Sequence, residues 1–457
     1  MKKILSFLTL LFIAVALVGC KPPEGLLTID SKDEYIEAGA TNIVMWCADF
    51  EEWQNQLNVS QRMDFNNIKN DGIQLSQVFI EQNDIDDRLR AARETNSTPD
   101  IYMISIGNLY KEVQNGYALD LTSYIDTWDD LIDSAYEGVT YDGKHYWYPI
   151  CLEPSTLLFY RKDLLSEYGN TTTIPTTWDA FLELCATIKS NIKAKGTKGL
   201  YAFDVPKGVD CAWGTWGMQV AASGGLAVDD TWSESRLLTS GREGYTKLGQ
   251  LWDTLFDKGY VPLSSGAYNE YIKQLCLDKQ VMSLCGSWSV SEIINTYPEL
   301  KDKIGIAKVP TFSGDQTGTL ATNGGWVYVI NSDCKNVAKA AEVIKWLVAG
   351  DDTSRTEYYF SKAYYSKSSP RKSVQAKIEE SLKTQTDVPT EWVELINEVT
   401  TTSILEPIYP WDISVAIEGY LEACAMGKGV DASLIEADTA IKNIILNSHT
   451  SGTNPRN

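Results

Sequence analysis

Histidine is scarce in this chain of 457 residues, which contains only His145 and His449. Two histidines leave almost no residues from which a histidine-based zinc site or catalytic triad could be built. The sequence also has no Cys-x-x-Cys pair, no P-loop, no Gly-x-Gly-x-x-Gly and no Gly-x-Ser-x-Gly. We therefore expect no metal, no cofactor and none of the enzyme classes that these motifs mark.

Basic residues and long apolar runs are also few. There are 40 Lys and Arg against 61 Asp and Glu, which gives a formal net charge of −21. The resulting field would repel nucleic-acid phosphates and anionic lipid, so we expect no nucleic-acid partner. A polytopic membrane protein is excluded, and the 44% of hydrophobic residues argues against disorder. The length predicts one to three globular domains.

The N-terminus has the pattern of an export signal. Two lysines precede an apolar stretch at 4–18, which is too short for a spanning helix. The stretch ends in Leu-Val-Gly-Cys at 17–20, which resembles the lipobox of bacterial lipoproteins. We predict a lipoprotein signal peptide over 1–19, a lipid on Cys20 and a tether over 20–40. The chain would then be anchored outside the cytoplasm on the bacterial cell membrane. The alternative is an ordinary signal peptide with a chance cysteine.

Eight cysteines follow Cys20. Their spacing is wide and most lie inside apolar runs, so buried thiols and disulfides are both open interpretations. They are Cys47, Cys151, Cys185, Cys211, Cys276, Cys285, Cys334 and Cys424.

Short β-type runs alternate with helix-type segments along the chain, which predicts an α/β fold. Two βαβ-like units are expected at the start of the fold. Thr176 and Asp179 have the spacing of a capping box before a helix. The other predicted helices are 84–94, 242–258, 338–348, 411–426 and 431–446. The predicted strands are 43–47, 74–80, 99–104, 157–160, 281–285, 304–307 and 326–330.

Tryptophans and acids follow several predicted strands, where ligands bind in open α/β sheets. Flat indole faces suit the C–H face of a sugar ring, and carboxylates suit its hydroxyls. Core packing is the alternative for each tryptophan, and we assign Trp178, Trp252 and Trp346 to packing. The residues in candidate positions are Trp46, Asp49, Trp213, Trp216, Trp288, Trp326 and Trp411.

A series of motifs resembles one known family in order and spacing. The resemblance is to family 1 extracellular solute-binding proteins, the maltodextrin-type receptors of bacterial ABC importers. It covers nearly the whole chain after the signal. The motifs are Tyr148-Pro149-Ile150-Cys151-Leu152-Glu153, Lys162-Asp163-Leu164-Leu165, Pro175-Thr176-Thr177-Trp178, Ala221-Ala222-Ser223-Gly224-Gly225, Gly286-Ser287-Trp288, Lys308-Val309-Pro310, Gly324-Gly325 and Glu406-Pro407-Ile408-Tyr409-Pro410.

The resemblance implies a two-lobed periplasmic-binding-protein-like fold of type II. Each lobe would be a sheet flanked by helices, and hinge crossings would join the lobes. The implied N-lobe is 41–148 plus about 327–368, and the implied C-lobe is 149–326 plus about 369–457.

The resemblance also implies site residues. Glu153 matches an acid that bonds sugar hydroxyls, and Trp288 matches a tryptophan that stacks on the sugar. Trp216 and Trp411 fall near two further aromatic platforms, with Trp213 close to the first. Glu153 as a merely structural acid remains an alternative.

The opposite lobe would contribute Trp46 and Asp49 from the loop after the first strand, and Trp326 lies by a crossing. Arg371 falls in a stretch found before the late helices of the family, although a surface cation is the alternative interpretation. The loop at 104–108 departs from the family because it lacks the acid and the base that maltodextrin receptors place there.

We therefore predict a monomeric, non-enzymatic receptor that binds a carbohydrate, most simply an oligosaccharide, and delivers it to the permease subunits of an ABC importer. Two alternatives stay open. One is an exported glycoside hydrolase or lyase, which would also use tryptophans and paired carboxylates. The other is the same receptor with a peptide, polyamine or other solute, because a fold does not fix its ligand.

Overall fold

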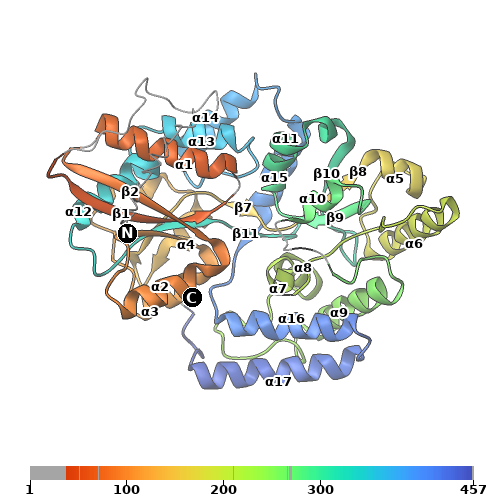
Figure 1. The fold of residues 1–457 in the computed structure, drawn as a ribbon. Coiled ribbons are helices and arrows are strands. Elements are labelled where there is room, and N and C mark those ends of the chain that lie inside the picture. Colours follow the sequence, from red (N-terminus) through yellow and green to blue (C-terminus); the bar gives the residue numbers. More distant parts are fainter. Residues whose placement is uncertain are drawn as a thin grey trace, which may run out of the picture.

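The computed structural model describes residues 38–454, apart from 51, 70, 209, 265 and 267–269. Two lobes lie next to each other and are joined by extended segments in the middle of the molecule (Figure 1). The predicted signal peptide, Cys20 and the tether up to residue 37 lie outside the described residues.

The N-lobe is built on a five-stranded sheet of order β2-β1-β3-β12-β6. β1 pairs in parallel with both β2 and β3, which confirms the two βαβ units expected at the start of the fold. β12 returns from far along the chain and pairs antiparallel with β3 and β6. The bounds are β1 Thr41–Asp49, β2 Ile73–Glu81, β3 Ile101–Ser105, β6 Trp147–Pro149 and β12 Trp326–Ile330.

The C-lobe has a three-stranded antiparallel sheet of order β10-β8-β9. Its central strand, β8, sends Leu158 into one hydrophobic cluster and Leu157 and Phe159 into another. Both faces of β8 are buried, which explains why its sequence is a continuous apolar run instead of an alternating one. The bounds are β8 Leu157–Arg161, β9 Met282–Cys285 and β10 Ile304–Ala307.

A third sheet, of order β13-β11-β7, lies where the chain crosses between the lobes. We call it the hinge sheet: β7 Glu153–Pro154, β11 Thr322–Gly324 and β13 Ile404–Leu405. Two of its strands have two residues and the third has three, so they are too short to show the alternation of hydrophobic side chains that predicts a strand. Beside it, Gly325 has φ +148°, and a Cβ there would lie 2.0 Å from the carbonyl oxygen of Cys151. The close approach of these two crossing segments therefore requires glycine.

Helices cover the sheets of both lobes (Figure 1). The N-lobe helices are α1 Glu52–Asp64, α2 Ile85–Glu94, α3 Leu109–Gln114, α4 Asp133–Val139, α12 Val337–Ile344, α13 Ser354–Lys362 and α14 Lys372–Leu382. The remaining helices are α5 Lys162–Gly169, α6 Trp178–Lys195, α7 Asp210–Trp213, α8 Trp216–Ser223, α9 Arg242–Asp257, α10 Tyr271–Cys276, α11 Ser289–Thr296, α15 Thr390–Thr402, α16 Trp411–Ala425 and α17 Val430–Ser448. A hairpin of β4 Thr140–Tyr141 and β5 Lys144–His145 and a π-helical turn at Lys345–Ala349 complete the regular structure discussed below.

The predicted cap of α6 is displaced by one residue. The side chain of Thr177, not that of Thr176, caps the helix, because its Oγ1 accepts a hydrogen bond of 3.3 Å from the backbone N–H of Ala180. The capping-box prediction was therefore wrong in register, although the helix was correct. Trp178 and Trp252 are buried, which confirms their assignment to packing.

The eight cysteines after Cys20 are all free thiols, seven of them buried. This resolves the open choice between thiols and disulfides. Burial also raises the pKa of Cys151 to about 11, so its thiol is protonated at neutral pH. Within the part of the chain that the structure describes, no helix combines the length and the apolar character that crossing a membrane requires.

Candidate functional site

Two of the predicted tryptophans form a stacked pair on the C-lobe side of the hinge sheet. Trp288 follows β9 and precedes α11, and Trp213 ends α7. Their ring centroids are 5.2 Å apart and their planes differ by 19°. The Trp288 ring also lies against Gly286, where a Cβ would come within 1.9 Å of it. Trp288 is 6% exposed and Trp213 is half-buried, so Trp213 is the more accessible ring of the pair.

Glu406 joins this pair, although sequence reasoning did not select it as a site residue. The indole Nε1–H of Trp213 donates a hydrogen bond to Oε1 of Glu406. Glu406 is 2% exposed and directly follows β13. The motif that contains Glu406 was recognised, but nothing in its local pattern distinguishes a buried acid from one on the surface.

Glu153 lies in β7 and forms a buried ion pair. Its Oε2 is 2.5 Å from Nζ of Lys367, and the two side chains are 6% and 3% exposed. β7 also contacts the residue that precedes Trp288, because the backbone N–H of Ser287 donates to the carbonyl of Pro154 over 3.0 Å. Glu153 thus lies on a strand that is bonded to the segment containing Trp288, but its carboxylate already has a cation as partner. Lys367 was not predicted.

The N-lobe residues gather around the end of β1. Asp49 ends this strand and accepts a hydrogen bond from Nδ2 of Asn55, which orients its carboxylate. The next residue, Phe50, packs edge-on against Trp326 with centroids 4.8 Å apart. Nζ of Lys367 lies 5.9 Å from the Phe50 ring, which places this group next to the Glu153 ion pair.

Trp46 belongs to the same strand as Asp49 but lies further from its end. It is half-buried, packs against the N-lobe core and pairs in register with Tyr102 of β3. The prediction placed both Trp46 and Asp49 on the loop after the first strand. That placement was wrong, because β1 extends through Asp49 and includes both residues.

Trp216 and Trp411 form a second aromatic group on the C-lobe. Their rings meet edge-to-face at 6.0 Å and 87°. Trp216 is 1% exposed and its Nε1–H donates to the hydroxyl of Tyr409 over 3.0 Å. Trp411 begins α16 and is half-buried. In this conformation the accessible indole surface of the pair belongs to Trp411, and Trp216 packs against it from the core.

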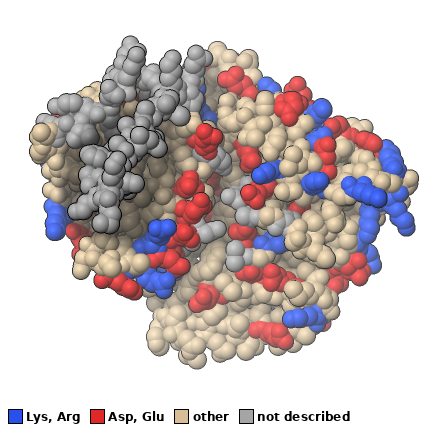
Figure 2. All heavy atoms as spheres, in the orientation of Figure 1, with Lys and Arg blue, Asp and Glu red and all other residues tan. Residues whose placement is uncertain are grey.

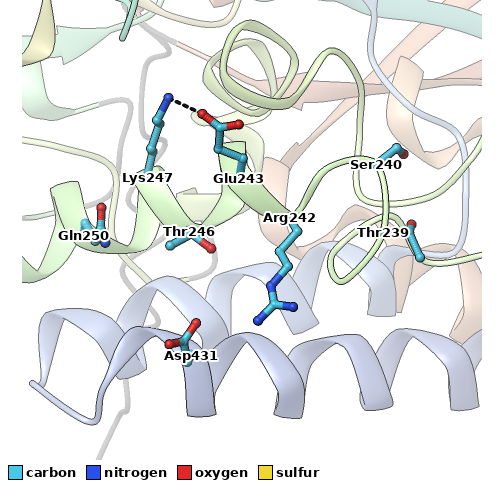
Figure 3. A pocket seen from close by; sticks show the side chains of 8 residues that line it. All are labelled: Thr239, Ser240, Arg242, Glu243, Thr246, Lys247, Gln250 and Asp431. Atoms are coloured by element: carbon cyan, nitrogen blue, oxygen red, sulfur yellow. Dashed lines mark hydrogen bonds and ion pairs between the residues drawn. The ribbon is translucent and has the colours of Figure 1, made fainter.

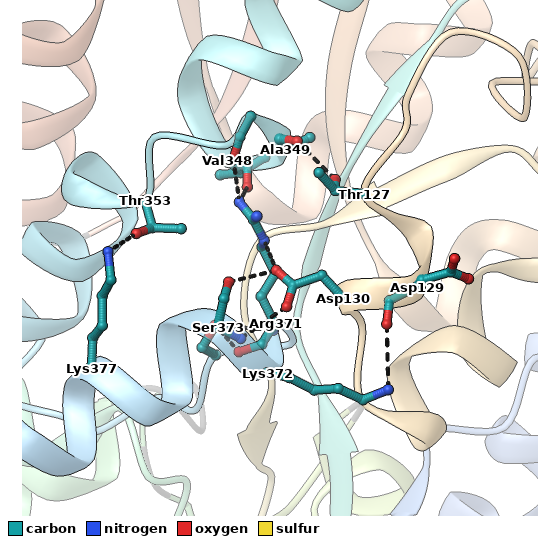
Figure 4. Close-up of polar contacts among 12 residues, drawn as sticks. Thr127, Asp129, Asp130, Val348, Ala349, Thr353, Arg371, Lys372, Ser373 and Lys377 are labelled. Carbon is teal, nitrogen blue, oxygen red and sulfur yellow. Dashed lines mark hydrogen bonds and ion pairs between the residues drawn. The ribbon is translucent and has the colours of Figure 1, made fainter.

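Arg371 is separate from these groups and is not a surface cation. It is 3% exposed; its Nε donates to Asp130 over 2.7 Å and its Nη1 donates to the carbonyls of Val348 and Gly350 over 3.0 and 2.7 Å (Figure 4). The surface-cation interpretation was therefore wrong. These contacts fasten the start of α14 to the N-lobe, and Val374 of α14 belongs to the N-lobe core. The N-lobe segment thus extends past 368, where the expected boundary lay.

The Arg371 cluster has a defined pH dependence. Burial by itself would raise the pKa of Asp130, but hydrogen bonds from Ser373 and Arg371 outweigh it and hold this pKa below its usual range. A carboxyl whose pKa is lowered by folding contributes stability above the unfolded-state pKa, near 3.9, and loses it as the pH falls through the folded-state value.

We expect Asp130→Asn to lower the free energy of unfolding by about 1 to 3 kcal/mol at pH 7, because the negative charge that strengthens the hydrogen bonds from Arg371 and Ser373 is lost. The difference from wild type should shrink as the pH falls from about 4 to 2, where Asp130 itself becomes protonated. Urea unfolding at a series of pH values measures this. Asp129→Asn, at the exposed neighbouring carboxylate, is the control and should behave like wild type. A pH-independent loss in Asp130→Asn would contradict the argument.

An open depression of about 620 Å³ lies on the C-lobe between α9 and α17 (Figure 3). Arg242, Glu243, Lys247 and Asp431 lie around it, and Lys247 pairs with Glu243. None of the predicted site residues lines it. Among the described residues, no group of three or more His, Cys, Asp or Glu side chains is arranged to hold a metal ion.

Solved structures share this fold. A solute-binding protein of Thermotoga lettingae bound with α-D-tagatose is 18% identical, with a TM-score of 0.73 over 89% of this chain and 100% of that one. The GacH receptor of Streptomyces glaucescens, solved with acarbose, is 18% identical, with a TM-score of 0.72 over 90% of this chain and 98% of that one. A Listeria monocytogenes substrate-binding protein in complex with cycloalternan is 18% identical, with a TM-score of 0.70 over 89% of this chain and 99% of that one.

The sequence itself matches a family model. The model is described as bacterial extracellular solute-binding protein and matches residues 62–390, from α1 through the start of α15. The match includes the tryptophan pair and the two strands of the hinge sheet that precede α15. Two lobes joined by such crossings, with aromatic and acidic side chains at the junction, are what a receptor that closes on a solute requires. This chain therefore belongs to the bacterial extracellular solute-binding protein family.

Proposed function

We propose that this protein is a lipid-anchored receptor that captures a neutral carbohydrate, most simply an oligosaccharide, between its lobes and delivers it to the permease of an ABC importer. The observation that carries the proposal is the stacked pair of Trp213 and Trp288 beside a buried carboxylate at the hinge sheet. An extended aromatic surface suits the C–H face of a sugar ring, and neighbouring carboxylates suit its hydroxyls.

The accessibility of the two rings refines the roles proposed for them. Trp213 is half-buried, whereas Trp288 is buried and packs against both Trp213 and Gly286. We therefore propose that the sugar stacks on Trp213 and that Trp288 supports this ring from below. Trp411 would provide a second platform, which Trp216 supports through an edge-to-face contact instead of a stacked one.

Contacts from the N-lobe would complete the site. Asp49 and Trp326 lie on the N-lobe near the Lys367–Glu153 pair. A ligand can bias the lobes toward closure only through contacts that differ between the open and closed states. A sugar that reaches Trp213 from one side and Asp49 from the other would make such contacts. Glu153 is bound to Lys367, and Arg371 is bound to Asp130 and two backbone carbonyls. Either residue would contact the ligand only if the ligand displaced these partners.

Charge argues against an anionic ligand, and the relatives favour a sugar. Acidic side chains gather along the middle of the face in Figure 2, where the two lobes of Figure 1 meet. Together with the net charge of −21, they would repel an anionic solute. The similar structures named above were solved with tagatose, acarbose and cycloalternan. A sugar is therefore the ligand class to test first.

The lipid anchor rests on the sequence at 17–20. The family is extracellular, which is consistent with an exported chain. Acyl chains on Cys20 would hold the receptor at the membrane that contains its permease.

Thermal unfolding of the protein from residue 21 onward tests the proposal. Separate panels of mono- and oligosaccharides, peptides and polyamines are added, and each compound is analysed chemically afterwards. A ligand at about 100 times its Kd should add about 2.7 kcal/mol of stability. A stabilising sugar recovered unchanged supports the receptor. A cleaved sugar would favour the hydrolase or lyase, and a response to peptides or polyamines alone would retain the receptor but exclude the sugar.

A further inference from the structure

The orientation of the Trp213 ring is fixed by a residue outside the predicted set. An indole on a short helix such as α7 can rotate about its side-chain bonds, so stacking on Trp288 alone leaves its N–H edge undetermined. The hydrogen bond from Nε1 to Glu406 removes this freedom. It also joins α7 to the segment after β13, 193 positions further along the chain.

Glu406 is itself held in a slot between two glycines. A Cβ on Gly324 of β11 would lie 2.1 Å from Oε1 of Glu406, and a Cβ on Gly107 would lie 3.5 Å from Oε2. Gly324 belongs to the hinge sheet and Gly107 to the turn after β3 in the N-lobe. The backbone N–H of Glu406 donates to the carbonyl of Asn323 over 3.2 Å. Both the backbone and the carboxylate of Glu406 are therefore positioned by their surroundings.

We propose that Glu406 is a positioning residue for the sugar platform: it holds Trp213 parallel to Trp288, so that the stacking surface exists before the ligand arrives. The proposal rests on the proposed function, in which this pair binds the sugar. Preorganisation of this kind raises affinity because the ring need not be ordered on binding. Glu406 acts through Trp213, and the sugar need not touch its carboxylate.

The first measurement needs no ligand. Stacked indoles couple in the ultraviolet circular dichroism spectrum, and the difference between wild type and Trp213→Phe isolates the coupling of this pair. Glu406→Leu removes the acceptor and should abolish this difference signal. Glu406→Gln keeps an acceptor oxygen and should retain most of it.

Gly324→Ala tests the slot without changing Glu406. The atom that the new methyl group meets is the end of the Glu406 side chain, so we expect the carboxylate to move and the hinge sheet to remain folded. Gly318→Ala is the matched control, because a Cβ at Gly318 meets nothing within 4 Å. Gly324→Ala should lose the coupling signal, and Gly318→Ala should keep it. If Glu406→Leu fails to fold, Gly324→Ala carries the test.

The second measurement is sugar affinity in a double-mutant cycle. Glu406→Leu should weaken binding on the order of tenfold, as expected for a hydrogen bond to a charged group. In the Trp213→Phe background, which lacks the indole N–H, Glu406→Leu should change affinity little further. The inference would be overturned if the losses of sugar affinity in Glu406→Leu and Trp213→Phe simply added in the double variant. It would also be overturned if Glu406→Leu folded and kept the wild-type indole coupling signal and sugar affinity. If no sugar binds the wild type while Glu406→Leu and Gly324→Ala still abolish the coupling signal, the carbohydrate function fails and the positioning role stands.

Discussion

Replacing Lys367 by methionine should lower the free energy of unfolding by about 3 to 5 kcal/mol, because it leaves the carboxylate of Glu153 buried without its cation. The side chains of both residues are almost fully buried, and their charged atoms lie 2.5 Å apart. Water cannot solvate Glu153 in place of Lys367. Urea unfolding of the ligand-free protein measures the loss.

Two further variants make this test specific. The double variant Glu153→Gln with Lys367→Met should recover a large part of the loss, because no uncompensated charge remains. Lys247→Met is the control, since Lys247 and Glu243 form an exposed pair whose loss should cost less than about 1 kcal/mol. A cost for Lys367→Met no larger than that of Lys247→Met would contradict the buried-pair argument. Because Glu153→Gln alone changes stability, its sugar affinity is interpretable only beside its unfolding curve.

Replacing Trp288 by alanine should cost about 3 to 5 kcal/mol of stability in addition to weakening sugar binding. Trp288 is 6% exposed and belongs to a core cluster with Leu157 and Phe159 of β8. Its removal leaves a cavity beneath Trp213. Thermal unfolding without ligand and sugar binding at low temperature separate the two effects.

Trp213→Ala is the matched comparison. Trp213 is half-buried, so its removal should cost less stability than that of Trp288 while weakening sugar binding at least as much. The reverse pattern, with a stable Trp288→Ala protein that has lost binding and a Trp213→Ala protein that binds normally, would show that the sugar contacts Trp288 directly. It would also contradict the order of the two rings argued from accessibility.

Much of the fold could be predicted because long elements carry local signals. The strands at 43–47 and 304–307 and the helices at 242–258 and 411–426 all formed, with bounds that differ by at most a few residues. The hinge sheet could not be predicted in this way, since strands of two or three residues are too short for a periodicity of hydrophobic side chains. Only the resemblance to a family indicated that crossings lay there.

The candidate site was predicted in part. The tryptophans at 213 and 288 were selected individually, and the structure brings them together. Arg371 was selected too, but its side chain is occupied by Asp130 and two carbonyls. Glu406 and Lys367 were missed because a single buried acid or lysine has no local pattern in a chain with 61 acids.

The sequence by itself determined the alternation of strands and helices, the family and the residue types available at the junction of the lobes. Only the tertiary structure decided which of these residues meet. Glu406 and Trp213 are 193 positions apart, and Lys367 and Glu153 are 214 positions apart. Local propensity acts over a few residues, whereas these contacts depend on how the hinge sheet brings distant segments together. The physical reason is the distance along the chain over which each effect acts: the pattern that forms a helix or strand is local, whereas the contacts that form the site join distant segments.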